Sequence, residues 1–435
     1  MTEPSKRVPI PKNGVDYRGK IVLAPMVRSG ECPSRLLALR YGADLVWGPE
    51  TIDKALIGTT RQVNDVTKAV EFTRLSSNGV KSPDAHPNQR ESIIYRLHPD
   101  REGRRLIYQI GTANPVTAVQ AARLVAPDVA GIDVNAGCPK PFSTSGGMGA
   151  ALLKTPDKLC AILEALVKEV GEPNEIGISV KIRILDTPDE TGALVSRLVK
   201  TGITGLTVHC RTTPMRPRER AIRDQLRMVA EICHEAGVAC LMNGDVTSRD
   251  EALKLMEEFG VDGAMIATAA ETNPSVFRAE SEGGVAPWRE VVHDYVKASM
   301  EVENRFGNTK YLLGQMIPGK QSAYKAMMAS KSYSQIAVAV GLQDDAAMML
   351  MAEDTDRKLE LGAFERPKMS KAERKAANKA TAAAKADATT GATMDEPASA
   401  GRKRTADDAQ LDVPADVRRE TGPGTVPEHA STLVV

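Results

Sequence analysis

The stretch from Gly131 to Leu153, GIDVNAGCPKPFSTSGGMGAALL, decides the fold. It begins with a short apolar run, which predicts a buried strand. Asn135 and Gly137 interrupt that run, and a helix-forming segment begins at Ala150. Cys138 lies in the loop between them, where α/β enzymes place catalytic side chains, so the thiol is a candidate catalyst. A lone cysteine is also often a small buried apolar residue, and its position alone favours neither interpretation.

Apolar runs of this kind recur along the chain and are separated by segments with helical periodicity. The eight predicted strands are residues 20–26, 43–50, 105–112, 131–137, 178–184, 205–211, 238–245 and 263–269. Strands that alternate with helices predict a parallel sheet, and eight such units in about 250 residues predict a closed (β/α)8 TIM barrel. A doubly wound open sheet is the alternative. It usually carries a G-x-G-x-x-G turn after its first strand, and no such turn follows residues 20–26.

Polar side chains occur toward the C-terminal ends of these strands, although strands buried on both faces should be almost entirely apolar. Taken singly, Gln109 and Asn243 could cap loops, and His209 could be a core histidine whose ring nitrogens find hydrogen-bond partners within the protein. Lys181 and Asp245 fit a buried ion pair. In a barrel, however, these strand ends meet at one mouth, where active sites lie, so the set predicts a binding site there. The set comprises Gln109, Asn135, Lys181, Arg183, His209, Arg211, Asn243 and Asp245.

Short motifs at these strand ends carry a family resemblance. They are LAPMVRSG (23–30), YQIGT (108–112), the stretch at 131–153, VKIRI (180–184), TVHCRT (207–212) and MNGDV (242–246). Together they resemble the tRNA-dihydrouridine synthases, most closely the eukaryotic branch that acts on uridine 20 of the tRNA D loop. The segment ENRFGNTKYLLGQM (303–316) is similar to the helical domain of that branch. The resemblance extends over residues 20–361 and depends on no single motif.

The resemblance implies a flavin enzyme that reduces the C5=C6 bond of a D-loop uridine in tRNA to 5,6-dihydrouridine. It implies FMN as the cofactor, NADPH as its reductant, a hydride delivered to C6, and a proton delivered to C5 by Cys138. An ordinary thiol has a pKa of roughly 8.5, so it is mostly protonated at neutral pH and can act as an acid. A cysteine nucleophile would instead need a neighbour that depresses its pKa.

The same resemblance assigns roles to the polar strand ends. Lys181 would lie near flavin N1 and O2, where negative charge develops on reduction, and Gln109 would bind the pyrimidine edge. The complete set expected to bind FMN is Pro25, Met26, Val27, Gln109, Lys181, His209, Asn243, Gly244, Asp245, Ala267 and Thr268. The phosphate would lie after the seventh and eighth strands, at Asn243–Asp245 and Ala267–Thr268. Asn135, Arg183 and Arg211 would bind the uracil and its phosphates.

Two features depart from the family pattern. Relatives usually have an arginine where this chain has Thr268, which removes one side-chain contact to the phosphate and predicts weaker FMN affinity. The second departure is a polar insertion, Ser76–Arg104, between the second and third predicted strands. Its Pro, Asn, His and Arg content predicts a surface loop rather than a catalytic element.

The chain divides into an N-terminal extension (1–19), the catalytic barrel (20–285), a helical domain (286–362) that the resemblance implies binds tRNA, and a disordered tail (363–435). Helices are predicted at 291–306, 310–316, 322–330 and 334–340. Basic residues of this domain that could meet tRNA phosphates, or form an ordinary solvated face, are Arg305, Lys310, Lys320, Lys325 and Lys331. Arg216, Arg218 and Arg220, in the loop 211–223, would add positive charge at the barrel mouth. From Arg366 onward no aromatic residue occurs, and Gly401–Arg404 is a basic cluster that fits a nuclear localisation signal.

Composition limits the possible functions. The net charge of the 435 residues is only +1, so a tRNA-binding chain must gather its positive side chains on one face. The six cysteines form no C-x-x-C pair and no metal-site spacing, which favours reduced thiols in the cytoplasm or nucleus. No apolar run reaches the ~20 residues of a membrane span, residues 1–20 lack a signal-peptide core, and no protein partner is implied.

Two other classes of function fit parts of the pattern. One is an FMN barrel enzyme that acts on a free pyrimidine, such as a dihydroorotate dehydrogenase, but the helical domain argues against it. The other is a tRNA-binding or chaperone-like protein without activity. The joint presence of Cys138, Lys181 and His209 argues against that class.

Overall fold

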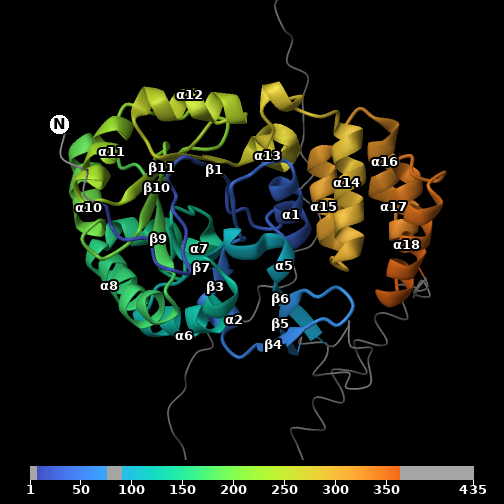
Figure 1. Ribbon diagram of the computed structural model, residues 1–435, viewed down its shortest axis with the longest axis horizontal. Helices are drawn as coiled ribbons and strands as arrows, with labels where there is room; N and C mark the ends of the chain where they lie inside the picture. The colour runs from blue at the N-terminus through green and yellow to red at the C-terminus, as the bar shows by residue number, and fades with distance from the viewer. Residues whose placement is uncertain (1–6, 76–90, 363–435) are drawn as a thin grey trace, which may run out of the picture. The chain divides into compact units, whose positions relative to one another are not determined.

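A closed barrel of eight parallel strands forms the centre of the protein in the computed structural model, which describes residues 7–75 and 91–362 (Figure 1). The strands are β1 (Lys20–Leu23), β2 (Leu45–Trp47), β7 (Leu106–Gly111), β8 (Gly131–Ala136), β9 (Gly177–Arg183), β10 (Gly205–His209), β11 (Ala239–Asn243) and β12 (Gly263–Ile266). All eight predicted strands are confirmed. Pairing of β2 with β7 closes the sheet, so the open doubly wound alternative is wrong. A two-residue strand, β3 (Thr51–Ile52), extends the pairing along β7.

Helices surround the barrel as the strand–helix alternation predicts (Figure 1). The longer ones are α1 (Cys32–Arg40), α6 (Pro115–Val125), α8 (Pro156–Leu166), α10 (Pro188–Leu198), α11 (Leu226–Glu235) and α12 (Arg249–Phe259). Short helical segments are α2 (Asp53–Leu56), α5 (Pro99–Glu102), η1 (Gly103–Arg105), η2 (Ala126–Asp128), α7 (Pro141–Thr144), η3 (Gly149–Lys154), η4 (Val167–Gly171), α9 (Glu172–Asn174), α13 (Thr268–Thr272), η5 (Pro274–Phe277) and η6 (Glu280–Glu282). A local sequence signal defines where α10 begins, because Thr187 and Glu190 form a capping box there.

Tyr17 closes the floor of the barrel. Its side chain is 1% exposed and its ring lies 5.8 Å from that of Trp47. Glycines begin the neighbouring strands because there is no room for a side chain: a Cβ on Gly205 would lie 2.6 Å from the Tyr17 ring. The predicted N-terminal extension therefore contributes to the barrel core at this residue. Because the floor is filled, the C-terminal mouth is the end of the barrel at which a ligand site is expected.

A small antiparallel sheet lies between β3 and β7 in the sequence. It consists of β4 (Thr60–Val63), β5 (Val70–Leu75) and β6 (Glu91–Leu97). The prediction of a surface loop over 76–104 is wrong for residues 91–104, which form β6, α5 and η1, whereas residues 76–90 lie outside the described part of the chain. Tyr95 of β6 is buried and packs edge-on against Tyr108 of β7 at 4.9 Å, which anchors the sheet to the barrel.

The C-terminal part of the described chain is a bundle of five helices: α14 (Trp288–Glu301), α15 (Phe306–Met316), α16 (Ser322–Ala329), α17 (Tyr333–Ala339) and α18 (Ala346–Lys358). The four predicted helices are confirmed with shifted bounds, and α18 was not predicted. The bundle has its own apolar cluster, which also takes in Leu37 and Tyr41 of the α1 region, and Tyr41 donates to Asp294 at 2.8 Å.

Within residues 7–75 and 91–362 no helix has the length and hydrophobicity to cross a bilayer. The predicted tail, with Gly401–Arg404, lies outside the described residues.

Candidate active site

The predicted polar residues meet at the C-terminal mouth because neighbouring parallel strands are in register. Asn135 of β8 pairs with Lys181 of β9, and Arg183 of β9 pairs with His209 of β10. His209 in turn pairs with Asn243 of β11. On four consecutive strands, Asn135 thus lies beside Lys181, and Arg183, His209 and Asn243 lie side by side two residues further along. The prediction that the strand ends converge on one site is confirmed.

Lys181 is a half-buried cation for which the described residues provide no ion pair and no hydrogen bond. Burial, followed by the charge of the neighbouring Arg183, lowers its pKa to about 8, and Asp133 acts in the opposite direction. The expected alternative of a Lys181–Asp245 ion pair is wrong, since Asp245 pairs with Arg211 instead. An ammonium held without an anionic partner is electrostatically suited to an anionic ligand.

Gln109 is buried, and its amide nitrogen is already engaged by the protein. Nε2 donates to Asp133 Oδ2 at 2.8 Å, and Ser179 donates to Asp133 Oδ1 at 2.7 Å. Burial raises the pKa of Asp133 to about 6. Sequence analysis did not identify Asp133, although an aspartate within the apolar run GIDVNAG was a visible signal. One N–H of the amide is thus occupied, and Gln109 can still offer a ligand its second N–H and its carbonyl oxygen.

His209 is neutral at physiological pH. Burial, followed by the charges of Lys181, Arg183 and Arg211, lowers its pKa to about 2. Its Nε2 lies 3.2 Å from Nη1 of Arg211. A guanidinium can only donate, so Nε2 accepts and the ring proton is on Nδ1. His209 is therefore a neutral group with one N–H to donate.

Arg183 and Arg211 support loops of the mouth, and their role in substrate binding stays a prediction. Arg183 donates through Nε to Gly137 O at 2.7 Å and through Nη1 to Thr212 O at 2.9 Å. Arg211 is 4% exposed, pairs with Asp245, and donates to Glu219 O at 2.7 Å. Both guanidinium groups use these bonds to hold the loops after β8 and β10 in place.

The ends of β11 and β12 form a cradle free of bulky side chains. Gly244 has φ +123°, and a Cβ there would lie 3.1 Å from the Ala221 methyl and 3.4 Å from the His209 ring. Asn243 Nδ2 donates to Met265 O at 2.9 Å, which joins the two strand ends. The helix α13 begins at the exposed Thr268, and no side chain caps it. The predicted phosphate position thus offers backbone N–H groups. The Asp245 carboxylate is instead engaged within the protein, because it accepts from Ala221 N at 2.7 Å.

Cys138 is half-buried in the loop that follows β8. Asn135 shapes this loop: its Oδ1 accepts from Gly137 N at 2.9 Å and from Cys138 N at 3.0 Å. Burial raises the pKa of the thiol, and the carboxylate of Glu50 raises it further. The thiol is therefore protonated at neutral pH, as an acid must be. Sequence analysis did not identify Glu50 as a site residue. Its position at the end of the predicted strand 43–50 was the only feature of the sequence that pointed to it.

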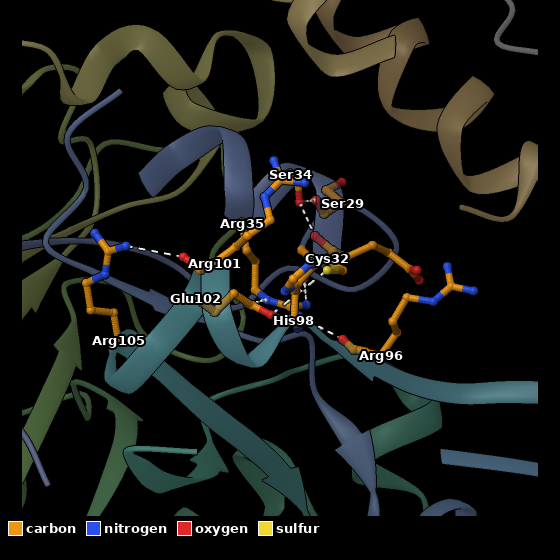
Figure 2. A network of polar contacts seen from close by, with 11 residues as sticks. Ser29, Cys32, Ser34, Arg35, Arg96, His98, Arg101, Glu102 and Arg105 are labelled. Atoms are coloured by element: carbon orange, nitrogen blue, oxygen red, sulfur yellow. Dashed lines mark hydrogen bonds and ion pairs between the residues drawn. The ribbon is translucent and has the colours of Figure 1, made fainter. Parts of the chain in front are cut away.

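The loop after β1 carries Pro25, Met26 and the 43%-exposed Val27, and a buried polar network holds it (Figure 2). Arg35 donates from Nη1 to Gly30 O at 2.8 Å, and its Nε lies 2.6 Å from Glu102 Oε1. Figure 2 shows Glu102 at the centre of this network, where its Oε2 also accepts from the His98 backbone N–H at 2.7 Å.

The same loop also contacts the bundle. The Arg28 guanidinium lies 4.0 Å from the centre of the Tyr311 ring in α15. The loop is therefore fastened on one side by the buried Arg35–Glu102 pair and on the other by this cation–π contact.

The basic side chains predicted to meet tRNA phosphates differ in their availability. Lys310 Nζ donates at 2.8 Å to both Met328 O and Ser330 O, so it caps α16 and is partly engaged within the bundle. The others are exposed: Arg305, Lys320, Lys325 and Lys331 in the bundle, and Arg216, Arg218 and Arg220 in the loop after β10. Within residues 7–75 and 91–362, no three His, Cys, Asp or Glu side chains are grouped so that they could hold a metal ion.

Residues 22–360 match the dihydrouridine synthase (Dus) family. A protein of Schizosaccharomyces pombe named tRNA-dihydrouridine(20) synthase (NAD(P)+) is 47% identical over 327 residues, which are 74% of this chain and 65% of that protein. The Saccharomyces cerevisiae protein of the same name is 45% identical over 338 residues, 76% of this chain and 86% of that one. The tRNA-dihydrouridine(20a/20b) synthase of Saccharomyces cerevisiae is 26% identical over 320 residues, 72% of this chain and 76% of that one. The chain thus spans just under two thirds of the fission-yeast relative.

Proposed function

The chain belongs to the dihydrouridine synthase family, and on that basis we propose that it reduces a D-loop uridine of tRNA, at position 20, to 5,6-dihydrouridine. The observation that carries the proposal is the barrel mouth. There, a protonated thiol on the loop after β8 lies beside a lysine of β9 that has no ion pair within the described residues. An acid for C5 of uracil and a cation for an anionic cofactor are what this reduction requires of the protein.

We propose FMN as the flavin, with NADPH as its reductant. The residues fit such a group: Lys181 offers an ammonium, neutral His209 offers Nδ1–H, and the cradle at Gly244 and Thr268 offers space and backbone N–H groups to one phosphate. When bound, reduced flavin supplies the hydride that adds to C6 of the uracil. Pro25, Met26 and Val27 would pack along the ring system. Reduction by NAD(P)H accords with the names of the two yeast relatives.

The protein's own part in the reaction is to orient the base and deliver a proton. Asn135 holds the Cys138 loop through two backbone N–H groups, and Arg183 holds the same loop from β9. The Cys138 S–H bond breaks as the C5–H bond forms. Lys181 would hold its positive charge beside the flavin, where it would stabilise negative charge on that group.

For tRNA binding we propose that the exposed cations of the bundle and of the loop after β10 contact the phosphates. They are Arg305, Lys320, Lys325, Lys331, Arg216, Arg218 and Arg220. Their positive charge would act locally, since the whole chain has a net charge of only +1. The six free thiols support a cytoplasmic or nuclear location.

A flavin reoxidation experiment separates this proposal from a barrel enzyme that acts on a free pyrimidine. We expect the full-length protein to be yellow, to release FMN rather than FAD on denaturation, and to accept electrons from NADPH. Under anaerobic conditions, unmodified tRNA should then reoxidise the flavin, whereas orotate or uracil should not. Faster reoxidation by the free pyrimidine than by tRNA would contradict the proposal, and release of FAD would contradict the single-phosphate cradle.

Replacement of Lys181 by methionine tests the role of its charge. We expect turnover on tRNA to fall by about 10²–10³-fold, because removing one preorganised electrostatic group typically has that effect. Binding of tRNA, measured by filter retention, should change less than about threefold, since the ammonium acts on the cofactor. The control is Lys254→Met on the exposed face of α12. Equal losses of turnover and tRNA binding in Lys181→Met would contradict the assigned role.

A further inference from the structure

Glu50 is a half-buried carboxylate at the barrel mouth for which the proposed reaction provides no role. It lies in the segment GPE (48–50) between β2 and β3. Its Oε1 accepts from Ser143 Oγ of α7 at 3.1 Å. Its Oε2 is buried and has no hydrogen bond of ordinary geometry within the described residues. Burial raises the pKa of this carboxyl group, which shows that its placement is unfavourable by itself.

Two glycines make room for Glu50 and the Cys138 loop to pack together. A Cβ on Gly111 would lie 2.5 Å from Glu50 Oε1. A Cβ on Gly149 would lie 2.4 Å from Ser143 Oγ and 2.6 Å from Cys138 O, and Gly149 also has φ +56°. Chain segments distant in sequence are therefore shaped so that this carboxylate meets the Cys138 loop.

The charges around Cys138 show what the carboxylate does there. Lys140 of its own loop, and Lys181 and Arg183 of β9, all interact electrostatically with the thiol and favour the thiolate. Glu50 is the negative group that acts on it from the β2 side, and Ser143, which donates to Glu50, lies in the α7 segment that follows Cys138. Cationic surroundings of this kind convert cysteines into nucleophiles, so an acid in this position needs an opposing negative charge.

We propose that Glu50 is a positioning residue that keeps Cys138 in its protonated form, so that the thiol serves as a proton donor rather than a nucleophile. This proposal rests on the proposed function only for the identity of the proton acceptor. In each turnover the S–H bond breaks as C5–H forms, and the thiolate regains its proton from water. The carboxylate of Glu50 remains unchanged.

The test is the pH dependence of alkylation of Cys138 by iodoacetamide, measured by mass spectrometry on the full-length protein as purified, without tRNA. Glu50→Gln preserves the shape of the side chain and removes its charge. We expect the midpoint of alkylation to move to lower pH by about one unit, which makes alkylation at neutral pH about tenfold faster. Cys160, half-buried on α8 beside Arg197, is the internal control and should be alkylated identically in both proteins.

The result is informative whether or not the chain acts on tRNA, because alkylation requires no substrate. An unchanged or raised midpoint for Cys138 in Glu50→Gln would overturn the proposal. If the variant does not fold, the unaltered protein still decides. Its Cys138 should titrate above the ordinary thiol range, and a midpoint below neutral pH would overturn the proposal. In a folded Glu50→Gln variant with activity, the alkaline limb of the rate should also move to lower pH.

Discussion

Cys138→Ala is expected to lower turnover on tRNA by about 10²–10⁴-fold, the usual contribution of a general acid. Reduction by NADPH and binding of tRNA should persist, because neither step needs a proton at C5. Single-turnover reoxidation of the flavin by tRNA, followed at the flavin absorption band, measures the loss. The residual activity would come from solvent protons, and label from the reduced flavin should still appear only at C6.

Cys160→Ala is the matched control, since Cys160 is also a half-buried thiol but lies on α8, away from the mouth. It should turn over tRNA at the parent rate. If Cys138→Ala did so too, Cys138 would be a small loop residue and the acid would have to be another group of the mouth.

Glu102→Ala is expected to lower the free energy of unfolding by about 3–5 kcal/mol, the usual effect of breaking a buried ion pair. Both side chains of the Arg35–Glu102 pair are 1% exposed, so the variant leaves a buried guanidinium without its anion. It also removes the acceptor for the His98 N–H. Urea unfolding followed by circular dichroism measures the change, and retention of flavin should fall as well, because Arg35 holds the loop after β1.

Glu169→Ala provides the comparison, because Glu169 forms an ion pair with Arg123 in which the side chains are 49% and 57% exposed. Its loss should cost less than about 1 kcal/mol. Equal destabilisation by the two variants would show that the Arg35–Glu102 pair does not support the fold in the way described.

The barrel strands were predictable because a parallel strand covered on both faces leaves a continuous apolar run, as in Gly131–Ala136. The small sheet was not. In β5 and β6, charged residues such as Glu71 and Arg96 interrupt the apolar pattern, and their pairing at 2.8 Å across the sheet is visible only in three dimensions. The helix α18 was missed because only Met348, Ala352 and Thr355 of it are buried, which leaves a weak apolar stripe.

The location of the site was predictable from the sequence, but the roles of its individual side chains were less so. Polar residues at strand ends show where a mouth lies, because the fold brings those ends together. Whether a guanidinium meets a ligand or a carbonyl depends on loop geometry, and Arg211 meets the carbonyl of Glu219. Glu50 was missed because its proximity to Cys138 depends on Gly111 and Gly149, residues that are distant from it in sequence.

The most direct test of the proposed function uses two transcripts of one tRNA, with uridine or cytidine at position 20 of the D loop. Each is incubated with the full-length protein and NADPH, and nuclease fragments are weighed by mass spectrometry. The account predicts that the D-loop fragment with uridine 20 gains two hydrogen atoms and that the cytidine transcript gains none. No gain in either transcript, or an equal gain in both, would contradict it.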